Sequence, residues 1–261
     1  GLIFRLTGEY EEAMVHYKKS RKLFHKVGDH AGISYAIGNA GDVYLIQGDY
    51  EMAMRCYKTW LNVSKKLGDK QGISEAFHYL GGVHKEKGDY NAAMVCYVNK
   101  LIISKELGDK VGVSRAFGKM GVIYREKGDY DTAMACFKKD LKICEELGDQ
   151  AGLSYVFGNM GTVYYNRGDY DAAMVCHEKK LKISKELENK RGISEALRYM
   201  GVVYNEKGDY DAAMVDFNRA IESDEEQNWI IDDQEKPKWE KNSYLTVLAN
   251  FFRTIRRIIR S

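Results

Sequence analysis

Residues 72–97 read GISEAFHYLGGVHKEKGDYNAAMVCY, and this stretch decides the fold. In its first half, apolar side chains recur at spacings of four and three residues, as on one face of an α-helix: Ile73, Phe77, Leu80 and Val83. In its second half a further apolar series begins at Tyr90 and continues through Leu101 to Leu107. The pattern predicts two successive amphipathic helices.

The triplet Gly-Asp-Tyr at residues 88–90 predicts the turn between these helices. Gly88 can take a positive φ at the end of the first helix without a steric penalty. Asp89 can accept hydrogen bonds from the unpaired amide groups at the start of the second helix. Two small residues, Gly81 and Ala93, predict that the helices approach each other closely where they cross. We therefore expect an antiparallel helix pair.

The whole unit repeats every 40 residues. The triplet Gly-Glu-Tyr or Gly-Asp-Tyr begins at Gly8, Gly48, Gly88, Gly128, Gly168 and Gly208. A second series keeps the same interval: Gly1, Gly41, Gly81, Gly121, Gly161 and Gly201. A fixed period of this kind indicates stacked units, each of which buries its apolar face against its neighbours. The chain is therefore predicted to be an all-α solenoid.

The small and aromatic positions of the unit resemble those of the tetratricopeptide repeat family: Gly121, Tyr124, Gly128, Tyr130, Ala133 and Phe137. The resemblance covers residues 1 to about 222 and implies a right-handed superhelix of antiparallel helix pairs. Ordinary members repeat about every 34 residues, so this unit is longer. Long units that end in Leu-Gly-Asp are similar to those of the Pins/LGN group of cell-polarity scaffolds and of very large animal multi-repeat scaffolds.

We divide the chain into a solenoid, a linker and a last helix. The solenoid begins with a half unit, as expected of a fragment, and continues with five full units: 1–31, then 32–71, 72–111, 112–151, 152–191 and 192–226. Residues 227–242 form an acidic linker with the single proline, Pro237. Residues 243–261 form a basic amphipathic helix.

Composition and motifs exclude several classes of function. Lys and Arg number 40 against 38 Asp and Glu, so no global field draws the chain to nucleic acid. No phosphate-binding, nucleophile-elbow or metalloprotease motif occurs, and we expect no enzyme activity, cofactor or metal. Cys56, Cys96, Cys136 and Cys176 share one register, but neighbouring units place them about 10 Å apart, too far for a shared metal ion. Five cysteines without a signal-peptide pattern predict a cytoplasmic protein, which could also be cortical or membrane-associated.

The resemblance implies that the first helix of each unit lines the concave wall of the superhelix, where such proteins bind partners. Side chains on that face differ between units, as in a binding groove, although a solvated face that is free to vary would look the same. The predicted groove combines basic and tyrosine side chains, which suit an extended, acidic peptide with apolar anchors. Two asparagines match groove positions of the Pins/LGN group. The predicted partner-binding residues are Asn39, Tyr79, Lys85, Arg115, Lys119, Arg125, Tyr155, Asn159, Tyr165, Arg198 and Tyr199.

The last helix has one apolar face and one basic face. It could cap the stack, occupy the groove of its own solenoid or that of a partner, or lie on an anionic membrane. The residues predicted for membrane contact are Phe251, Phe252, Arg253, Arg256, Arg257 and Arg260. Anchoring by this helix is the alternative function that the sequence leaves open.

Overall fold

The structure, a computed structural model, describes residues 1–225, and every secondary-structure element in that range is an α-helix. The predicted linker and the predicted C-terminal helix, with Phe251, Phe252 and the four arginines, lie outside the described residues. The helices are α1 (Leu2–Leu6), α2 (Tyr10–Lys26), α3 (His30–Ile46), α4 (Tyr50–Leu67), α5 (Lys70–Glu86), α6 (Tyr90–Glu106), α7 (Lys110–Glu126), α8 (Tyr130–Leu147), α9 (Gln150–Asn166), α10 (Tyr170–Glu186), α11 (Lys190–Glu206) and α12 (Tyr210–Glu225).

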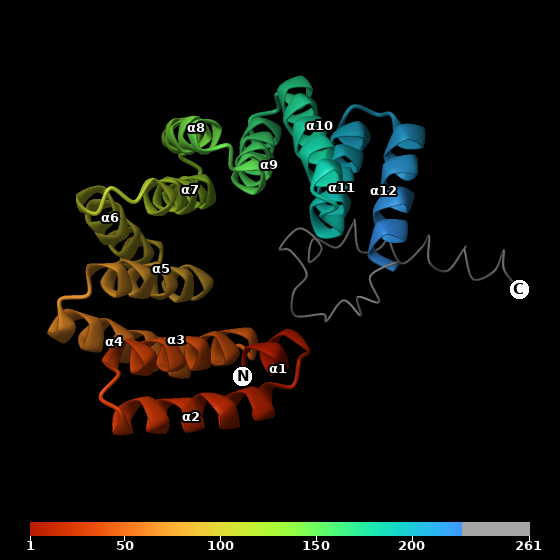
Figure 1. Ribbon diagram of the computed structural model, residues 1–261. Coiled ribbons are helices and arrows are strands. Elements are labelled where there is room, and N and C mark those ends of the chain that lie inside the picture. Colours follow the sequence, from red (N-terminus) through yellow and green to blue (C-terminus); the bar gives the residue numbers. More distant parts are fainter. Residues whose placement is uncertain (226–261) are drawn as a thin grey trace, which may run out of the picture.

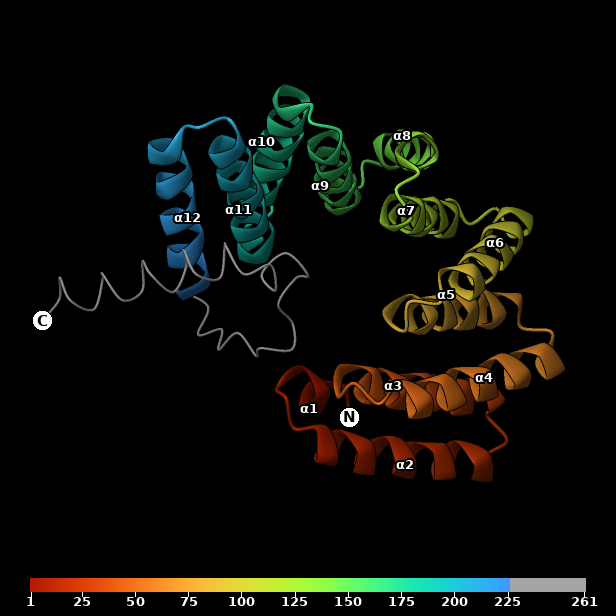
Figure 2. The same ribbon diagram turned by 180° about the vertical axis from the view of Figure 1, so that it is seen from behind.

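The helices stack in chain order into an open, curved array (Figures 1 and 2). The most extensive packing lies within the predicted pairs, such as α5 with α6 and α7 with α8. Each odd-numbered helix from α3 to α9 also contacts the next odd-numbered helix, whereas no comparably extensive contact joins successive even-numbered helices among residues 1–225. The odd-numbered helices therefore form the inner layer of the curve, as the ribbon shows (Figure 1). The predicted all-α solenoid of helix pairs is confirmed.

The Gly-Asp-Tyr turn has the predicted geometry. Gly88 has a φ of 78°, in the left-handed region that favours glycine. The Asp89 carboxylate accepts a hydrogen bond of 3.0 Å from the backbone N–H of Ala92 and so caps α6. A glycine with a positive φ and a side chain that caps the next helix recur along the array, both within units and between them.

One joint between units departs from this rule. The sequence Leu-Glu-Asn at residues 187–189 replaces Leu-Gly-Asp, and Glu188 is the one non-glycine residue among those described that has a positive φ, 52°. Asn189 still caps α11, since its side-chain oxygen accepts a hydrogen bond of 3.0 Å from Gly192 N–H. The strain therefore sits in the backbone of Glu188.

We expect Glu188→Gly to stabilise the chain. A left-handed conformation costs a residue with a Cβ about 1–2 kcal/mol, partly offset by the larger chain entropy that glycine loses on folding. The net gain in the free energy of unfolding should be about 0.5–1 kcal/mol, measured by urea denaturation. The opposite change at an equivalent joint, Gly148→Ala, should lower the free energy of unfolding, because Gly148 also has a positive φ. If Glu188→Gly did not raise the free energy of unfolding, the strain at Glu188 would be contradicted.

The close approach expected at Gly81 is an approach to an aromatic ring. A Cβ added to Gly81 would lie 2.7 Å from Cε1 of Tyr97, a residue with 1% of its surface exposed. The same glycine register faces a ring in every unit: Gly1 with Tyr17, Gly41 with Tyr57, Gly121 with Phe137, Gly161 with His177 and Gly201 with Phe217. Ala93, the other small residue, is fully buried. Each helix pair is thus built around a ring that lies on a glycine.

Two neighbouring glycines of α5 provide a matched test of this contact. A Cβ on Gly82 would meet no atom within 4 Å, so Gly82→Ala should raise the free energy of unfolding by about 1 kcal/mol through helix propensity alone. Gly81→Ala gains the same propensity but pushes against Tyr97, which should cost about 1–3 kcal/mol. We expect the two variants to differ by that amount in urea denaturation followed by circular dichroism. Equal stabilities would show that the ring moves aside without cost.

Candidate functional site

The candidate site is the inner face of the array, which we define as the surface of α3, α5, α7, α9 and α11 that faces the inside of the curve. All eleven predicted partner-binding residues lie on these five helices. Their surroundings differ, however, and divide them into a basic centre and a more densely packed remainder.

The centre of the inner face is a contact between α7 and α9. Arg125 Nη1 donates a hydrogen bond of 2.7 Å to Asn159 Oδ1, and Lys119 Nζ lies 5.3 Å from the centroid of the Tyr155 ring. Arg115, one turn before Lys119 on α7, is exposed. We call these five residues, Arg115, Lys119, Arg125, Tyr155 and Asn159, the basic cluster. The structure therefore brings five of the eleven predicted residues together.

Electrostatic effects in the neighbourhood agree with a positive centre. Burial, together with the positive charges of Lys100, Lys119 and Arg115, lowers the pKa of His78 to about 3. His78 therefore stays neutral at physiological pH, and the positive charge of the region is carried by lysine and arginine. Of these, Arg125 also pairs with Glu126 at 2.8 Å.

Three predicted residues serve mainly in packing. Asn39 is buried, and its side chain donates a hydrogen bond of 2.8 Å to the Tyr35 carbonyl of its own helix. Tyr79 stacks on Tyr57 of the preceding unit with ring centroids 5.1 Å apart. Tyr199 stacks on His177 of the preceding unit at 4.9 Å. Their contribution to a partner surface is limited to the ring edges and atoms left by these contacts.

The other predicted residues lie nearer the helix ends or the end of the array. Lys85 pairs with Glu86 at 2.6 Å. The Tyr165 hydroxyl donates a hydrogen bond of 3.4 Å to Glu206, and burial together with this carboxylate raises the pKa of Tyr165 to about 12. Arg198 is half-buried on α11. The role of all eleven residues in binding stays a prediction.

Sequence reasoning missed a second set of residues, which comes from the even-numbered helices. One register there varies from unit to unit, and we call it the variable column: Trp60, Lys100, Asp140, Lys180 and Ala220. Lys100 is fully buried, and its Nζ lies 2.9 Å from Glu75 of α5. Lys180, also buried, lies 2.7 Å from Glu195 of α11. Side chains of the column therefore contact the inner helices, and the two lysines form ion pairs beneath the inner face.

Glycines of the inner helices make room for this column. A Cβ on Gly38 would lie 2.8 Å from the Trp60 ring, and one on Gly118 would lie 2.6 Å from the Asp140 carboxylate. A Cβ on Gly158 would lie 3.0 Å from Lys180 Cδ. The signal in the sequence was the irregular residue type at this one register of a nearly uniform repeat, with a glycine 22 positions earlier in three of the units, such as Gly118 before Asp140.

Asp140 is the one carboxyl of the variable column. It is buried, its carboxylate accepts a hydrogen bond from the Ser114 hydroxyl, and burial raises its pKa to about 6. The hydrogen bonds from Ser114 and Cys144 oppose the rise without cancelling it. Ionised Asp140 is therefore a destabilising charge at neutral pH.

Asp140→Asn should remove this penalty. Between about pH 4 and pH 6 the folded chain binds a proton at Asp140 that the unfolded chain has lost, so the contribution of Asp140 to stability falls as pH rises through that window. The free energy of unfolding of the variant, relative to the unmodified chain, should rise by about 2 kcal/mol from pH 4 to pH 7. Urea denaturation at a series of pH values measures this difference. A difference that does not change with pH would refute the raised pKa.

Within residues 1–225 no group of three or more His, Cys, Asp or Glu side chains is arranged to hold a metal ion. None of the helices in the same range combines the length and apolarity needed to cross a bilayer.

Family models described as tetratricopeptide repeat match this sequence. One matches residues 1–66 and 149–226, and another matches residues 116–151. No curated protein matches the chain.

Several solved structures are similar in fold. The crystal structure of BtubC (BKLC) from P. vanneervenii has a TM-score of 0.72 at 21% identity, covering 87% of this chain and 96% of that one. The apo form of RapI has a TM-score of 0.69 at 12% identity, covering 85% and 79%. A Rap protein complexed with competence and sporulation factor has a TM-score of 0.68 at 16% identity, covering 82% and 64%. At identities this low, the structural likeness shows a shared fold alone.

Proposed function

We propose that this chain, which belongs to the tetratricopeptide repeat family, is a non-catalytic scaffold whose inner face binds an extended acidic peptide. Members of this family generally mediate protein–protein interactions. The observation that carries the proposal is the basic cluster on α7 and α9. There two helices of adjacent units present guanidinium, ammonium, phenol and amide groups to one side of the array.

The chemistry of the basic cluster suits a carboxylate-bearing segment. A guanidinium can bind a carboxylate through two parallel hydrogen bonds, which gives Arg115 and Arg125 geometric specificity as well as charge. Tyr155 is 39% exposed and offers a rigid apolar surface with a polar edge for an apolar anchor. An extended peptide that crosses α7 and α9 can use both kinds of contact.

The buried ion pairs beneath the inner face favour the same reading. Lys100 and Lys180 are each matched by a glutamate, Glu75 and Glu195, so their charges are largely compensated within the fold. The basic cluster retains arginine and lysine groups at the surface. This local excess explains how a chain with balanced overall charge can select an acidic partner.

Three finer points belong to the same proposal. The 40-residue unit and its Leu-Gly-Asp ending place the chain near the Pins/LGN-type scaffolds within the family. A cytoplasmic location, at the cell cortex or elsewhere, agrees with five cysteines that are all free thiols. The alternative, membrane anchoring through residues 243–261, rests on the sequence pattern alone, and loss of liposome flotation on deleting those residues would establish it.

A charge-reversal variant tests the inner face. Arg115→Glu, Lys119→Glu and Arg125→Glu together should abolish capture of specific partners from a cell lysate, because the reversed cluster repels acidic segments. The matched control is Lys138→Glu, Lys142→Glu and Lys182→Glu, which changes the net charge equally at exposed positions of α8 and α10. Affinity purification with mass spectrometry compares the three proteins after circular dichroism shows that each is folded.

Captured segments should be acidic, and their binding should weaken as salt rises. Synthetic peptides of the captured regions then give dissociation constants for each variant. If the inner-face variant and the control retain the same partners, the inner face is not the binding site.

A further inference from the structure

Exposed ion pairs connect successive units on the outer side of the array. The second residue of an even-numbered helix pairs with a basic residue at the end of the odd-numbered helix that follows, 36 positions later. Lys87 lies 2.5 Å from Glu51, and Lys207 lies 2.6 Å from Asp171. Arg167 pairs with Asp131 in the same way. We call this series the outer ladder.

The outer ladder lacks its carboxylate at one joint. Asn91 occupies the acidic position on α6, and Lys127 Nζ donates a hydrogen bond of 3.1 Å to its amide oxygen. No Asp or Glu among residues 1–225 lies within ion-pair distance of Lys127. The amide satisfies one donor of the ammonium group but leaves its charge uncompensated.

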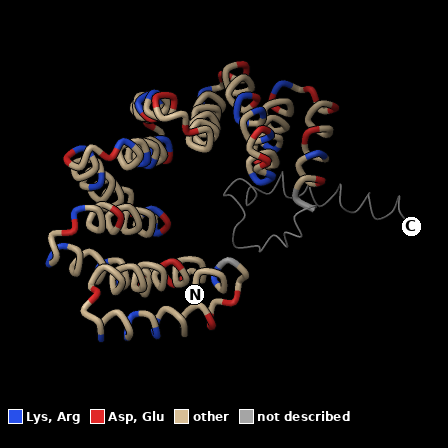
Figure 3. Tube along the Cα trace, in the orientation of Figure 1, with Lys and Arg blue, Asp and Glu red and all other residues tan. Residues whose placement is uncertain are grey.

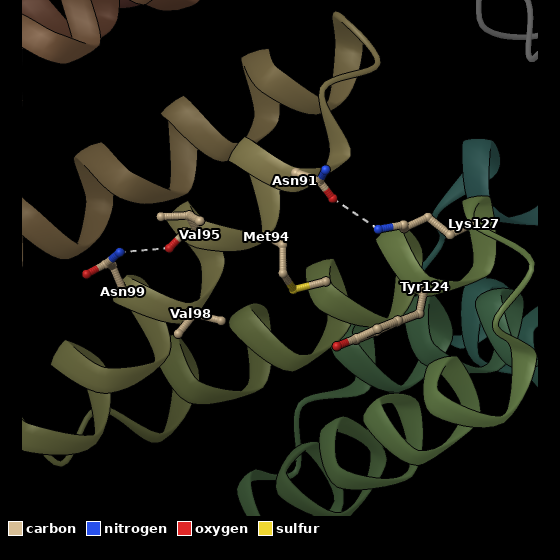
Figure 4. Close-up of a pocket in the computed structure, with 7 residues that line it drawn as sticks. All are labelled: Asn91, Met94, Val95, Val98, Asn99, Tyr124 and Lys127. Atoms are coloured by element: carbon tan, nitrogen blue, oxygen red, sulfur yellow. Dashed lines mark hydrogen bonds between the residues drawn. The ribbon is translucent and has the colours of Figure 1, made fainter.

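A hollow of about 320 Å³ opens beside this charge (Figure 4). Its apolar lining comes from Met94, Val95 and Val98 of α6 and from Tyr124 of α7, while Asn91, Asn99 and Lys127 are its polar residues. Val95 is 60% exposed, so the hollow is open to an approaching chain. The volume is at the lower end of the range of ligand sites and fits one or two side chains.

The apolar side chain of Val98 is specific to this unit. At the register of Val98 the other units carry Lys18, Lys58, Lys138, Glu178 and Asn218, whereas the register of Val95 is apolar in every unit except the preceding one, which carries Arg55. Helix α6 accordingly has fewer charged residues than α4 and α8 (Figure 3). Its outer surface thus departs from the repeat in two ways at the same place, by gaining the apolar side chain of Val98 and by losing an acid at Asn91.

We propose that the hollow between α6 and α7 binds a partner segment that carries a carboxylate next to an apolar side chain. The carboxylate pairs with Lys127 in the place that Glu51, Asp131 or Asp171 fills elsewhere in the outer ladder. The apolar side chain enters between Val95 and Val98 and covers Met94. Because α6 belongs to the outer layer, this site is separate from the inner face, and one chain can hold two segments at once.

N-acetyl-leucine tests the proposal as the smallest probe with both features, and N-acetyl-leucinamide is its neutral match. Methyl NMR spectra of protein labelled at Met and Val follow the signals of Met94, Val95 and Val98. We expect N-acetyl-leucine to shift these signals in a saturable way, and the amide to bind about tenfold more weakly because it cannot pair with Lys127.

Two variants copy residues that the fold already accepts at the same registers. Asn91→Asp gives Lys127 an internal carboxylate, as at Asp131 and Asp171, and should lower the affinity for N-acetyl-leucine to that of the amide. Val98→Lys, as at Lys58 and Lys138, should abolish the shifts. The remaining methyl signals report whether each variant keeps its fold.

The proposal is wrong if N-acetyl-leucine leaves the three methyl groups unshifted or shifts only methyl groups elsewhere. It is also wrong if the amide, or the Asn91→Asp variant, gives the same response as N-acetyl-leucine with the unmodified chain. These outcomes are independent of the inner face, since none of the inner-face residues is changed.

Discussion

The contact between a glycine of the inner helix and a ring of the outer helix is the constraint on which the array depends. It recurs in every unit, from Gly1 with Tyr17 to Gly201 with Phe217, and sets how closely the two helices of a pair approach. His177 shows that the shape of the ring matters more than its polarity. Its imidazole is fully buried, neither ring nitrogen has a hydrogen-bond partner, and burial lowers its pKa to about 3. A neutral ring of about the right size therefore suffices.

With the pair geometry fixed, the remaining variation is concentrated in a few registers. The variable column places Lys100, Asp140 and Lys180 within the core, where each finds a hydrogen-bonding or ionic partner. Buried ion pairs of this kind add little net stability compared with apolar residues, yet losing one partner is costly. Such positions therefore change in matched sets, and they distinguish one unit of a nearly uniform array from the next.

Local chemistry and the alignment of neighbouring inner helices were predictable from the sequence, and the ring contacts between units were not. The turn at Gly88 and Asp89 follows from backbone preferences of single residues, so the sequence was enough to locate it. The basic cluster also follows from the 40-residue period, which aligns neighbouring inner helices. The stacking of Tyr79 and Tyr199 on the preceding units does not, because it depends on which ring lies opposite. Lys100 was missed for a different reason, since a lysine on an amphipathic helix is usually exposed.

In an open stack whose units contact mainly their neighbours, the angle between successive units can change without disrupting the units themselves. The stiffness of the stack is set at the joints, because the two helices of a pair pack more extensively than successive pairs do. A ligand that spans α7 and α9 would contact both sides of one such joint, so its binding would act on the angle there. Small angular changes at successive joints would add along the array. The distance between its two ends would therefore respond most to a ligand bound on the inner face.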